Sequence, residues 1–208
     1  MKILLIGKQG SGKGTYADYL SEKYKIPHIS TGEMCRDIAK EGSELGKKVK
    51  DLIDNGNLIP DDIMISILKE RFKREDCKNG FILDGFPRNL HQAQALEEIT
   101  DIKVAFHLKI SDEVSVKRLS SRRQCKNCGK IYNLITNPAK NGKCECNGEL
   151  YQREDDKEEA IKKRLETYRS EEEDLMEFYH AIIRSVDAEK PISEVLKSLE
   201  SFIKELKQ

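Results

Sequence analysis

The chain has 208 residues, and its 37 basic and 37 acidic side chains give a formal net charge of zero at pH 7. This length suits one α/β domain with small insertions and excludes a large multidomain machine. The balanced charge excludes a global basic field for DNA or RNA.

Apolar runs predict five short β-strands, at residues 2–6, 26–29, 81–83, 104–110 and 182–186. Helical spacing begins at Lys13 after the first strand, and further helices are expected at 33–40, 45–53, 61–74, 90–98, 112–122 and 158–179. The alternation predicts an α/β fold with a five-stranded parallel sheet, whose ligands lie at the carboxyl ends of the strands. The early apolar run, at 3–6, is too short for a signal peptide or a membrane span, so we expect a cytoplasmic protein with no membrane partner.

Two segments interrupt the alternation and are candidate insertions. Residues 31–59 are helical without an intervening strand, and residues 125–150 are rich in Asn, Gly, Lys and Cys.

The stretch GKQGSGKGT, from Gly7 to Thr15, predicts a phosphate-binding loop between the first strand and the first helix. Glycines let the main-chain N–H groups turn inward, and the helix N-terminus behind them favours an anion. Lys13 adds a point charge for the β- and γ-phosphates. The residues expected to bind the triphosphate are Gly10, Ser11, Gly12, Lys13, Gly14 and Thr15.

One position departs from the general phosphate-loop pattern. Gly14 follows the lysine where a Ser or Thr ligand of Mg²⁺ is usual, and the hydroxyl comes one residue later, at Thr15. This argues against a GTPase or a motor ATPase. We expect Mg²⁺ to be held by phosphates and waters, with Asp84 acting through water.

Five separated motifs resemble adenylate kinase, in the long-lid form found in bacteria. They are GKQGSGKGT at Gly7, STGEMCRDI at Ser30, FILDGFPRNLHQAQAL at Phe81, RLSSRR at Arg118 and LYQREDDKEEAIKKRL at Leu150. The resemblance covers nearly the whole chain. It implies a fold of the P-loop NTPase type and the reversible reaction of ATP, carried with Mg²⁺, and AMP to give two ADP.

That reaction requires no general base, because the attacking phosphate is already mostly ionised at neutral pH. Catalysis must come from positioning and from positive charge around the transferred phosphoryl group. Lys13 and four arginines are therefore the expected catalytic residues: Arg88, Arg122, Arg153 and Arg164. The four histidines, at 28, 91, 107 and 180, lie outside the matched positions and are expected to be structural or exposed.

The remaining site residues follow from their positions in the matched motifs. The resemblance implies that AMP is bound by Thr31, Arg36, Asn57, Leu58, Ile59, Gly85, Phe86, Pro87, Arg88, Gln92, Arg153 and Arg164. Gln92 would read the adenine edge, since an amide can both donate and accept. ATP would also contact Arg118, Arg122, Ile131, Tyr132 and Lys190.

The resemblance also implies a division of the chain. The core would comprise 1–29, 60–120 and 154–208, the insertion binding the monophosphate nucleotide 30–59, and the lid 121–153. Adenylate kinase lids are themselves a known example of substrate-induced closure, and we expect both insertions to close on the nucleotides. A monomer is implied.

Four cysteines in the lid predict a structural Zn²⁺ site. Cys125 and Cys128 form C-x-x-C, and Cys144 and Cys146 form C-x-C, one residue shorter than the second pair usual in this family's metal-binding lids. Four thiolates can close a tetrahedral site that leaves no position for substrate. The alternative is a lid with free thiols held by hydrogen bonds. Cys35 and Cys77 stand apart and are expected to be buried.

Two other functions remain possible from the residues alone. A nucleoside monophosphate kinase of the same fold could prefer another base, although Thr31 and Gln92 favour adenine at the acceptor. Alternatively, Cys-pair ribbons bind nucleic acid, and lysines surround these pairs, which would suit a zinc-ribbon module with an ATP site. The neutral charge and the GFPR motif argue against that alternative.

Overall fold

A computed structural model describes residues 1–206, and within them five strands form a parallel sheet. The strands lie in the order β2 (His28–Ser30), β3 (Phe81–Asp84), β1 (Lys2–Ile6), β4 (Val104–Lys109) and β8 (Ile183–Asp187). This confirms the predicted α/β class and parallel sheet. The second strand begins two residues later than expected and ends one residue later, at 28–30 instead of 26–29.

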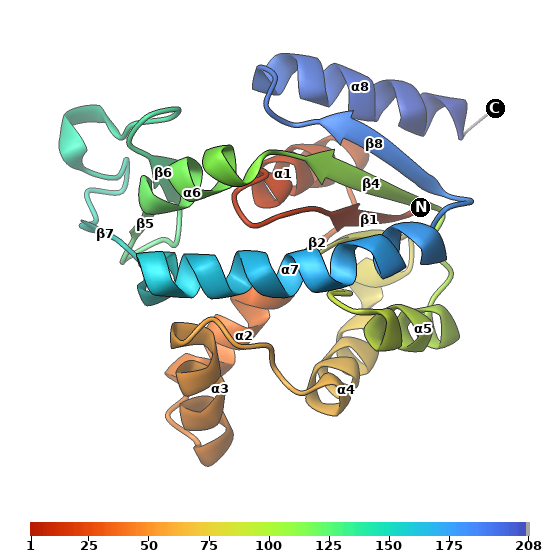
Figure 1. Ribbon diagram of the computed structural model, residues 1–208, viewed down its shortest axis with the longest axis horizontal. Helices are drawn as coiled ribbons and strands as arrows, with labels where there is room; N and C mark the ends of the chain where they lie inside the picture. Colours follow the sequence, from red (N-terminus) through yellow and green to blue (C-terminus); the bar gives the residue numbers. More distant parts are fainter. Residues whose placement is uncertain (207–208) are drawn as a thin grey trace.

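Helices cover both faces of this sheet (Figure 1). They are α1 (Lys13–Tyr24), α2 (Thr31–Lys40), α3 (Glu44–Asp54), α4 (Asp61–Phe72), α5 (Leu90–Ile99), α6 (Asp112–Ser120), α7 (Glu158–Phe178) and α8 (Ile192–Glu205). The helix expected to reach Arg122 ends at Ser120, and α8 lies in a segment for which no helix was predicted.

The central strand β1 divides its side chains between two cores. Ile3 and Leu5 pack with α1 and α8, whereas Leu4 and Ile6 face the core formed with α2, α3, α4, α5 and α7. Successive side chains of a strand point to opposite faces. The phosphate loop therefore directly follows a strand that is packed on both faces.

The first candidate insertion contains α2 and α3, which project from the sheet on the side of α4 (Figure 1). Ser43 caps α3 by accepting a hydrogen bond from the Gly46 N–H. Helix α7 runs from α6 to α5 across the molecule.

The second candidate insertion forms a small antiparallel sheet, in the order β6 (Ile131–Asn133), β5 (Arg122–Cys125) and β7 (Leu150–Tyr151). Its core consists of Cys125, Tyr132 and Cys144. Short 3₁₀ helices complete the chain at Glu75–Cys77, Lys140–Gly142 and Glu154–Asp156. The expected division at 30–59 and 121–153 stays a prediction, and residues 207 and 208 of its last core segment lie outside the described residues.

Among the helices of residues 1–206, we find none that combines the length and the apolar character needed to cross a bilayer. The expected burial of Cys35 and Cys77 is confirmed.

Candidate functional site

The phosphate loop follows β1 and ends where α1 begins, at Lys13. Gly10 and Gly12 have φ angles of 83° and 91°, in the left-handed region that favours glycine. Helix α1 has no side-chain cap at its N-terminus, so its first N–H groups remain available for an anion. The loop therefore has the backbone geometry of a phosphate site.

Lys13 is half-buried beneath this loop. Its Nζ donates hydrogen bonds to the carbonyls of Gly7, at 2.6 Å, and Lys8, at 2.9 Å. Burial is the main cause that lowers the pKa of Lys13 from 10.5 to about 8; the Asp84 carboxylate opposes this shift, and the charges of nearby arginines add to it. Ser11 is fully buried behind the loop, and its hydroxyl oxygen lies 3.5 Å from Lys13 Nζ.

A cavity of about 910 Å³ extends from this loop to α5. That volume is at the upper end of the range of about 300–1,000 Å³ usual for small-molecule sites. Apart from Ser11, every expected nucleotide-binding residue lines it: Gly10, Gly12, Lys13, Gly14, Thr15, Thr31, Arg36, Asn57, Leu58, Ile59, Gly85, Phe86, Pro87, Arg88, Gln92, Arg118, Arg122, Ile131, Tyr132, Arg153, Arg164 and Lys190. The motifs therefore converge on the same space although they are far apart in the sequence.

One end of the cavity lies between α2, α4 and the loop after β3. Thr31 is buried, and its hydroxyl donates to the Asp84 carbonyl at 3.2 Å. Arg88 Nε donates to the Gly85 carbonyl at 2.7 Å. Gln92 is 2% exposed, and its Oε1 accepts a hydrogen bond from the Arg88 N–H at 2.8 Å. This end combines a guanidinium with a fixed amide.

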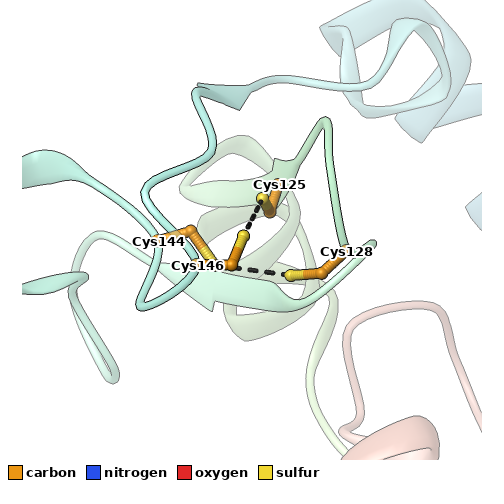
Figure 2. A group of neighbouring side chains, drawn as sticks. All are labelled: Cys125, Cys128, Cys144 and Cys146. Carbon is orange, nitrogen blue, oxygen red and sulfur yellow. Dashed lines mark hydrogen bonds between the residues drawn. The ribbon is translucent and has the colours of Figure 1, made fainter.

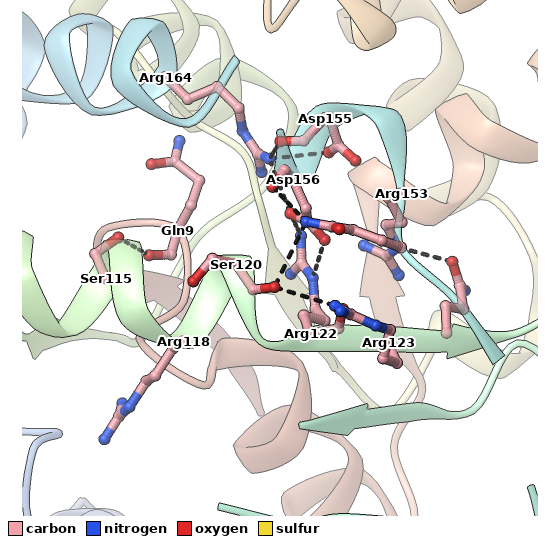
Figure 3. A network of polar contacts seen from close by, with 12 residues as sticks. Gln9, Ser115, Arg118, Ser120, Arg122, Arg123, Arg153, Asp155, Asp156 and Arg164 are labelled. Atoms are coloured by element: carbon pink, nitrogen blue, oxygen red, sulfur yellow. Dashed lines mark hydrogen bonds and ion pairs between the residues drawn. The ribbon is translucent and has the colours of Figure 1, made fainter. Parts of the chain in front are cut away.

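Three arginines meet between the two ends (Figure 3). Arg122, at the start of β5, donates from Nε and Nη2 to Asp156, whose side chain is fully buried. Arg164, on α7, donates to both the carbonyl and the carboxylate of Asp155. The two aspartates hold these arginines in position, whereas α7 begins after Lys157 without a side-chain cap. In this structure Asp155 and Asp156 orient arginines, and neither caps α7.

Arg153 completes this group and is 6% exposed. Its Nε donates to Gln124 Oε1 at 2.7 Å, but its Nη2 is buried without a hydrogen-bond partner in residues 1–206. Burial, together with the charges of Arg122 and Arg36, lowers the pKa of Arg153 to about 9. Burial also lowers the pKa of Arg164 to about 10. A group of desolvated, mutually repelling cations favours the binding of a polyanion in the cavity.

Helix α6 supports the other end of the cavity. Arg118 donates to the carbonyls of Gly10, at 3.3 Å, and Ala188, at 2.9 Å. Lys190 follows on the loop between β8 and α8. Arg118 thus ties the phosphate loop to that segment.

Asp84 ends β3 beside the phosphate loop. Its Oδ2 lies 3.7 Å from His28 Nε2, and His28 Nδ1 lies 2.8 Å from Asp18. Burial lowers the pKa of His28, but the two carboxylates outweigh burial and raise it to about 9. His28 fits its expected structural role, although the motifs did not indicate its contact with Asp84. An Asp84 carboxylate facing the cavity is a suitable partner for a hydrated Mg²⁺.

The four lid cysteines come together in space (Figure 2). The Sγ atoms of Cys125 and Cys146 are 3.4 Å apart, those of Cys128 and Cys144 3.5 Å apart, and all four lie within 4.8 Å of one another. A tetrahedral Zn²⁺ with Zn–S bonds of about 2.3 Å sets S–S distances near 3.8 Å. The C-x-C spacing therefore still brings Cys146 into a group of four that fits a metal ion.

Tyr132 lies between the cysteines and the cavity. Its hydroxyl donates to Cys144 Sγ at 3.3 Å, and this hydrogen bond is the main cause that lowers the pKa of Cys144 to about 6. The thiolate is the form that binds a metal. Tyr132 therefore connects the cysteine group with the wall of the cavity.

Sequence reasoning missed the residues that support the site from behind. Asp61 accepts a hydrogen bond from Gln92, Ser115 donates to the phosphate loop, and Gln124 binds Arg153. These are ordinary polar residues on helices or a strand, and no motif distinguishes them.

Comparisons with known proteins agree with this geometry. A family model described as Adenylate kinase matches residues 5–183. Adenylate kinase of Thermosipho melanesiensis is 50% identical over 209 residues, covering 94% of this chain and 98% of its own. Adenylate kinase of Caldicellulosiruptor bescii is 50% identical over 87% of each chain, and that of Archaeoglobus fulgidus is 45% identical over the full length of both.

Proposed function

The chain belongs to the adenylate kinase family, and from this premise we propose that it transfers a phosphoryl group reversibly between ATP and AMP, giving two ADP. The observation that carries the proposal is the line of buried and half-buried positive charges along the cavity. It begins at Lys13, passes the arginines held by Asp155 and Asp156, and reaches Arg88. Such a line matches two nucleotides whose phosphates meet.

The donor nucleotide occupies the end formed by the phosphate loop. Main-chain N–H groups of the loop and Lys13 bind the β- and γ-phosphates. Arg118 covers the adenine, and the Lys190 carbonyl accepts a hydrogen bond from the adenine amino group. Ile131 and Tyr132 bring the lid onto ATP, and their position in the cavity wall supports this assignment.

The acceptor nucleotide occupies the end between α2 and α5. Arg36 and Arg88 bind its phosphate, since both guanidinium groups line that end of the cavity. Thr31 and Gln92 contact the base, and residues 57–59 form the wall beneath it. The amide of Gln92 can accept from the 6-amino group of adenine and donate to its N1.

Transfer depends on position and charge. The AMP phosphate oxygen attacks in line with the bond that breaks, and it needs no base because it is already ionised. Arg122, Arg153 and Arg164 neutralise the charge that spreads over the transferred group. Arg153 Nη2 is buried and has no hydrogen-bond partner among residues 1–206, which supports this role because the atom can donate to a phosphate oxygen.

Two metals complete the proposal. Asp84 would hold Mg²⁺, carried with ATP, through water, and the ion would neutralise phosphate charge. Cys125, Cys128, Cys144 and Cys146 would hold Zn²⁺, which would stabilise the lid, whose own core comprises three residues. Segments 30–59 and 121–153 close over the nucleotides and exclude water.

We further propose a cytoplasmic monomer whose partners are nucleotides. Four thiols grouped for a metal favour a reducing compartment, because oxidising conditions would turn them into disulfides.

A coupled assay for ADP formed from ATP, Mg²⁺ and AMP tests the proposal. The wild-type protein turns over AMP, and Lys13→Met loses activity by more than about a hundredfold, the magnitude of a lost transition-state charge contact. Normal activity in Lys13→Met would remove the loop from the mechanism. A preference for another monophosphate in the same assay would reassign the acceptor base.

A further inference from the structure

The side-chain amide of Gln92 is bonded at both ends within the protein. Its Oε1 faces the Arg88 N–H at 2.8 Å, and its Nε2 donates to Asp61 Oδ1 at 2.5 Å. A main-chain N–H can only donate, and a carboxylate can only accept. The reversed amide would therefore oppose donor to donor and acceptor to acceptor.

Asp61 is itself held in place as the first residue of α4. His91 Nδ1 lies 2.8 Å from its Oδ2, and Asn89 Nδ2 lies 3.4 Å from the same oxygen. Burial raises the pKa of Asp61, but its hydrogen bonds, led by that of Gln92, outweigh burial and lower the pKa below its usual value. The carboxylate thus stays ionised, and accepts only, at neutral pH.

The two bonds use one lone pair of Oε1 and one hydrogen of Nε2. An amide has a second lone pair and a second hydrogen, so one acceptor site on Oε1 and one donor site on Nε2 remain beyond these two bonds. Gln92 lines the cavity although its side chain is almost fully buried. The two bonds therefore fix which end of the Gln92 amide can accept a hydrogen bond from a ligand and which end can donate one.

We propose that Asp61 determines the base specificity of the acceptor site by holding the amide of Gln92 in one orientation. This inference rests on the proposed function. Adenine donates from its 6-amino group and accepts at N1, which matches the fixed order of acceptor and donor. Hypoxanthine and guanine accept at O6 and donate from N1, the opposite order, and would need the reversed amide. Asp61, together with the Arg88 N–H, disfavours the 6-oxopurine nucleotides without touching them.

The test compares AMP with IMP, which differ at the 6-position of the base and in the proton on N1. Asp61→Asn keeps the shape of the side chain but can donate as well as accept, so the reversed amide of Gln92 finds a partner. We expect kcat/KM for IMP relative to AMP to rise about tenfold, because one mismatched buried contact is removed. Asp62→Asn, one residue further along α4 and exposed, is the matched control and leaves the ratio unchanged.

An equal loss with both nucleotides in Asp61→Asn would indicate a merely structural role and overturn the inference. Gln92→Leu separates it from the proposed function. If Gln92→Leu leaves KM for AMP unchanged, the acceptor-site assignment fails. If Gln92→Leu raises KM for AMP but Asp61→Asn leaves the IMP ratio unchanged, the Asp61 inference alone fails.

A measurement on the wild-type protein keeps the inference testable if Asp61→Asn does not fold. Amide NMR signals of Gln92, assigned by their loss in Gln92→Leu, should exchange with solvent at least tenfold more slowly than those of the exposed Gln94. Equal exchange would mean that Asp61 does not hold the amide.

Discussion

The hydroxyl of Ser115, on α6, donates a hydrogen bond to the main-chain carbonyl of Gln9 in the phosphate loop, 106 residues away in the sequence. The same helix contacts consecutive loop residues through three pairs: Lys8 with Asp112, Gln9 with Ser115 and Gly10 with Arg118. Because α6 leads into β5, the phosphate loop and the lid share one support.

Ser115→Ala should therefore weaken the donor site. We expect KM for ATP to rise about three- to tenfold, the equivalent of one lost hydrogen bond, with KM for AMP unchanged. Steady-state kinetics with each nucleotide varied in turn measures this. Ser198→Ala removes a comparable hydroxyl on α8, which bonds within its own helix, and should change neither constant. Equal increases in both constants for Ser115→Ala would contradict the prediction.

Asp156→Ala should destabilise the protein strongly. The Asp156 carboxylate is fully buried against Arg122, and removing one partner leaves an uncompensated buried charge, at a cost of about 3–5 kcal/mol. Urea unfolding measures the loss. Glu158→Gln breaks an exposed pair with Lys162 and should cost no more than about 0.5 kcal/mol. Similar decreases in the free energy of unfolding for both variants would show that the buried ion pair does not stabilise the fold.

Lys13 should make ATP binding sensitive to alkaline pH. Burial lowers its pKa to about 8, so the free protein loses this charge as the pH rises through 8, whereas an unfolded lysine keeps it to about 10.5. We expect kcat/KM for ATP to fall above pH 8. Between pH 8 and 10.5 the unfolded state binds more protons, so the contribution of Lys13 to stability rises with pH in that window. Lys13→Arg keeps its charge at alkaline pH, so its kcat/KM for ATP should not fall above pH 8. If the variant and the wild-type protein have the same pH profile, another group causes the fall.

Metal removal should unfold the lid selectively. We expect one Zn²⁺ per chain by elemental analysis, and Cys146→Ser should lose it because the four Sγ atoms form one site. The variant should show a separate low-temperature unfolding transition while the α/β core keeps its own. Cys77→Ser, outside the lid, should retain the metal. Full metal content in Cys146→Ser would exclude that cysteine as a ligand.

The core of the fold was predictable because buried parallel strands appear as short apolar runs. Helix α8 was missed although Val195, Leu199 and Ile203 are buried at helical spacing. Arg122 was assigned to a helix because its neighbours have helical spacing, but it pairs with Asn133 in an antiparallel ladder. Strands as short as β6 and β7 depend on pairing between distant residues, which local periodicity does not indicate.

The cavity wall was predictable because its residues belong to contiguous motifs at strand ends. The positions of Asp155 and Asp156 left their role open, since an aspartate before a helix can also be a cap. The roles of Asp61 and Gln124 could not be predicted, because each depends on a hydrogen bond to a side chain 29 or more residues away in the sequence. Long-range partners of this kind become visible once the chain is folded.

Because β1 is packed on both faces, it should be among the last parts of the molecule to unfold locally. Hydrogen exchange should be slowest in β1, where Ile3 and Leu4 are fully buried, and fast in the small sheet that contains Tyr132. The phosphate loop is therefore attached to the last part of the molecule to exchange. Large fluctuations of the lid can occur while the anchor of the donor phosphates stays closed.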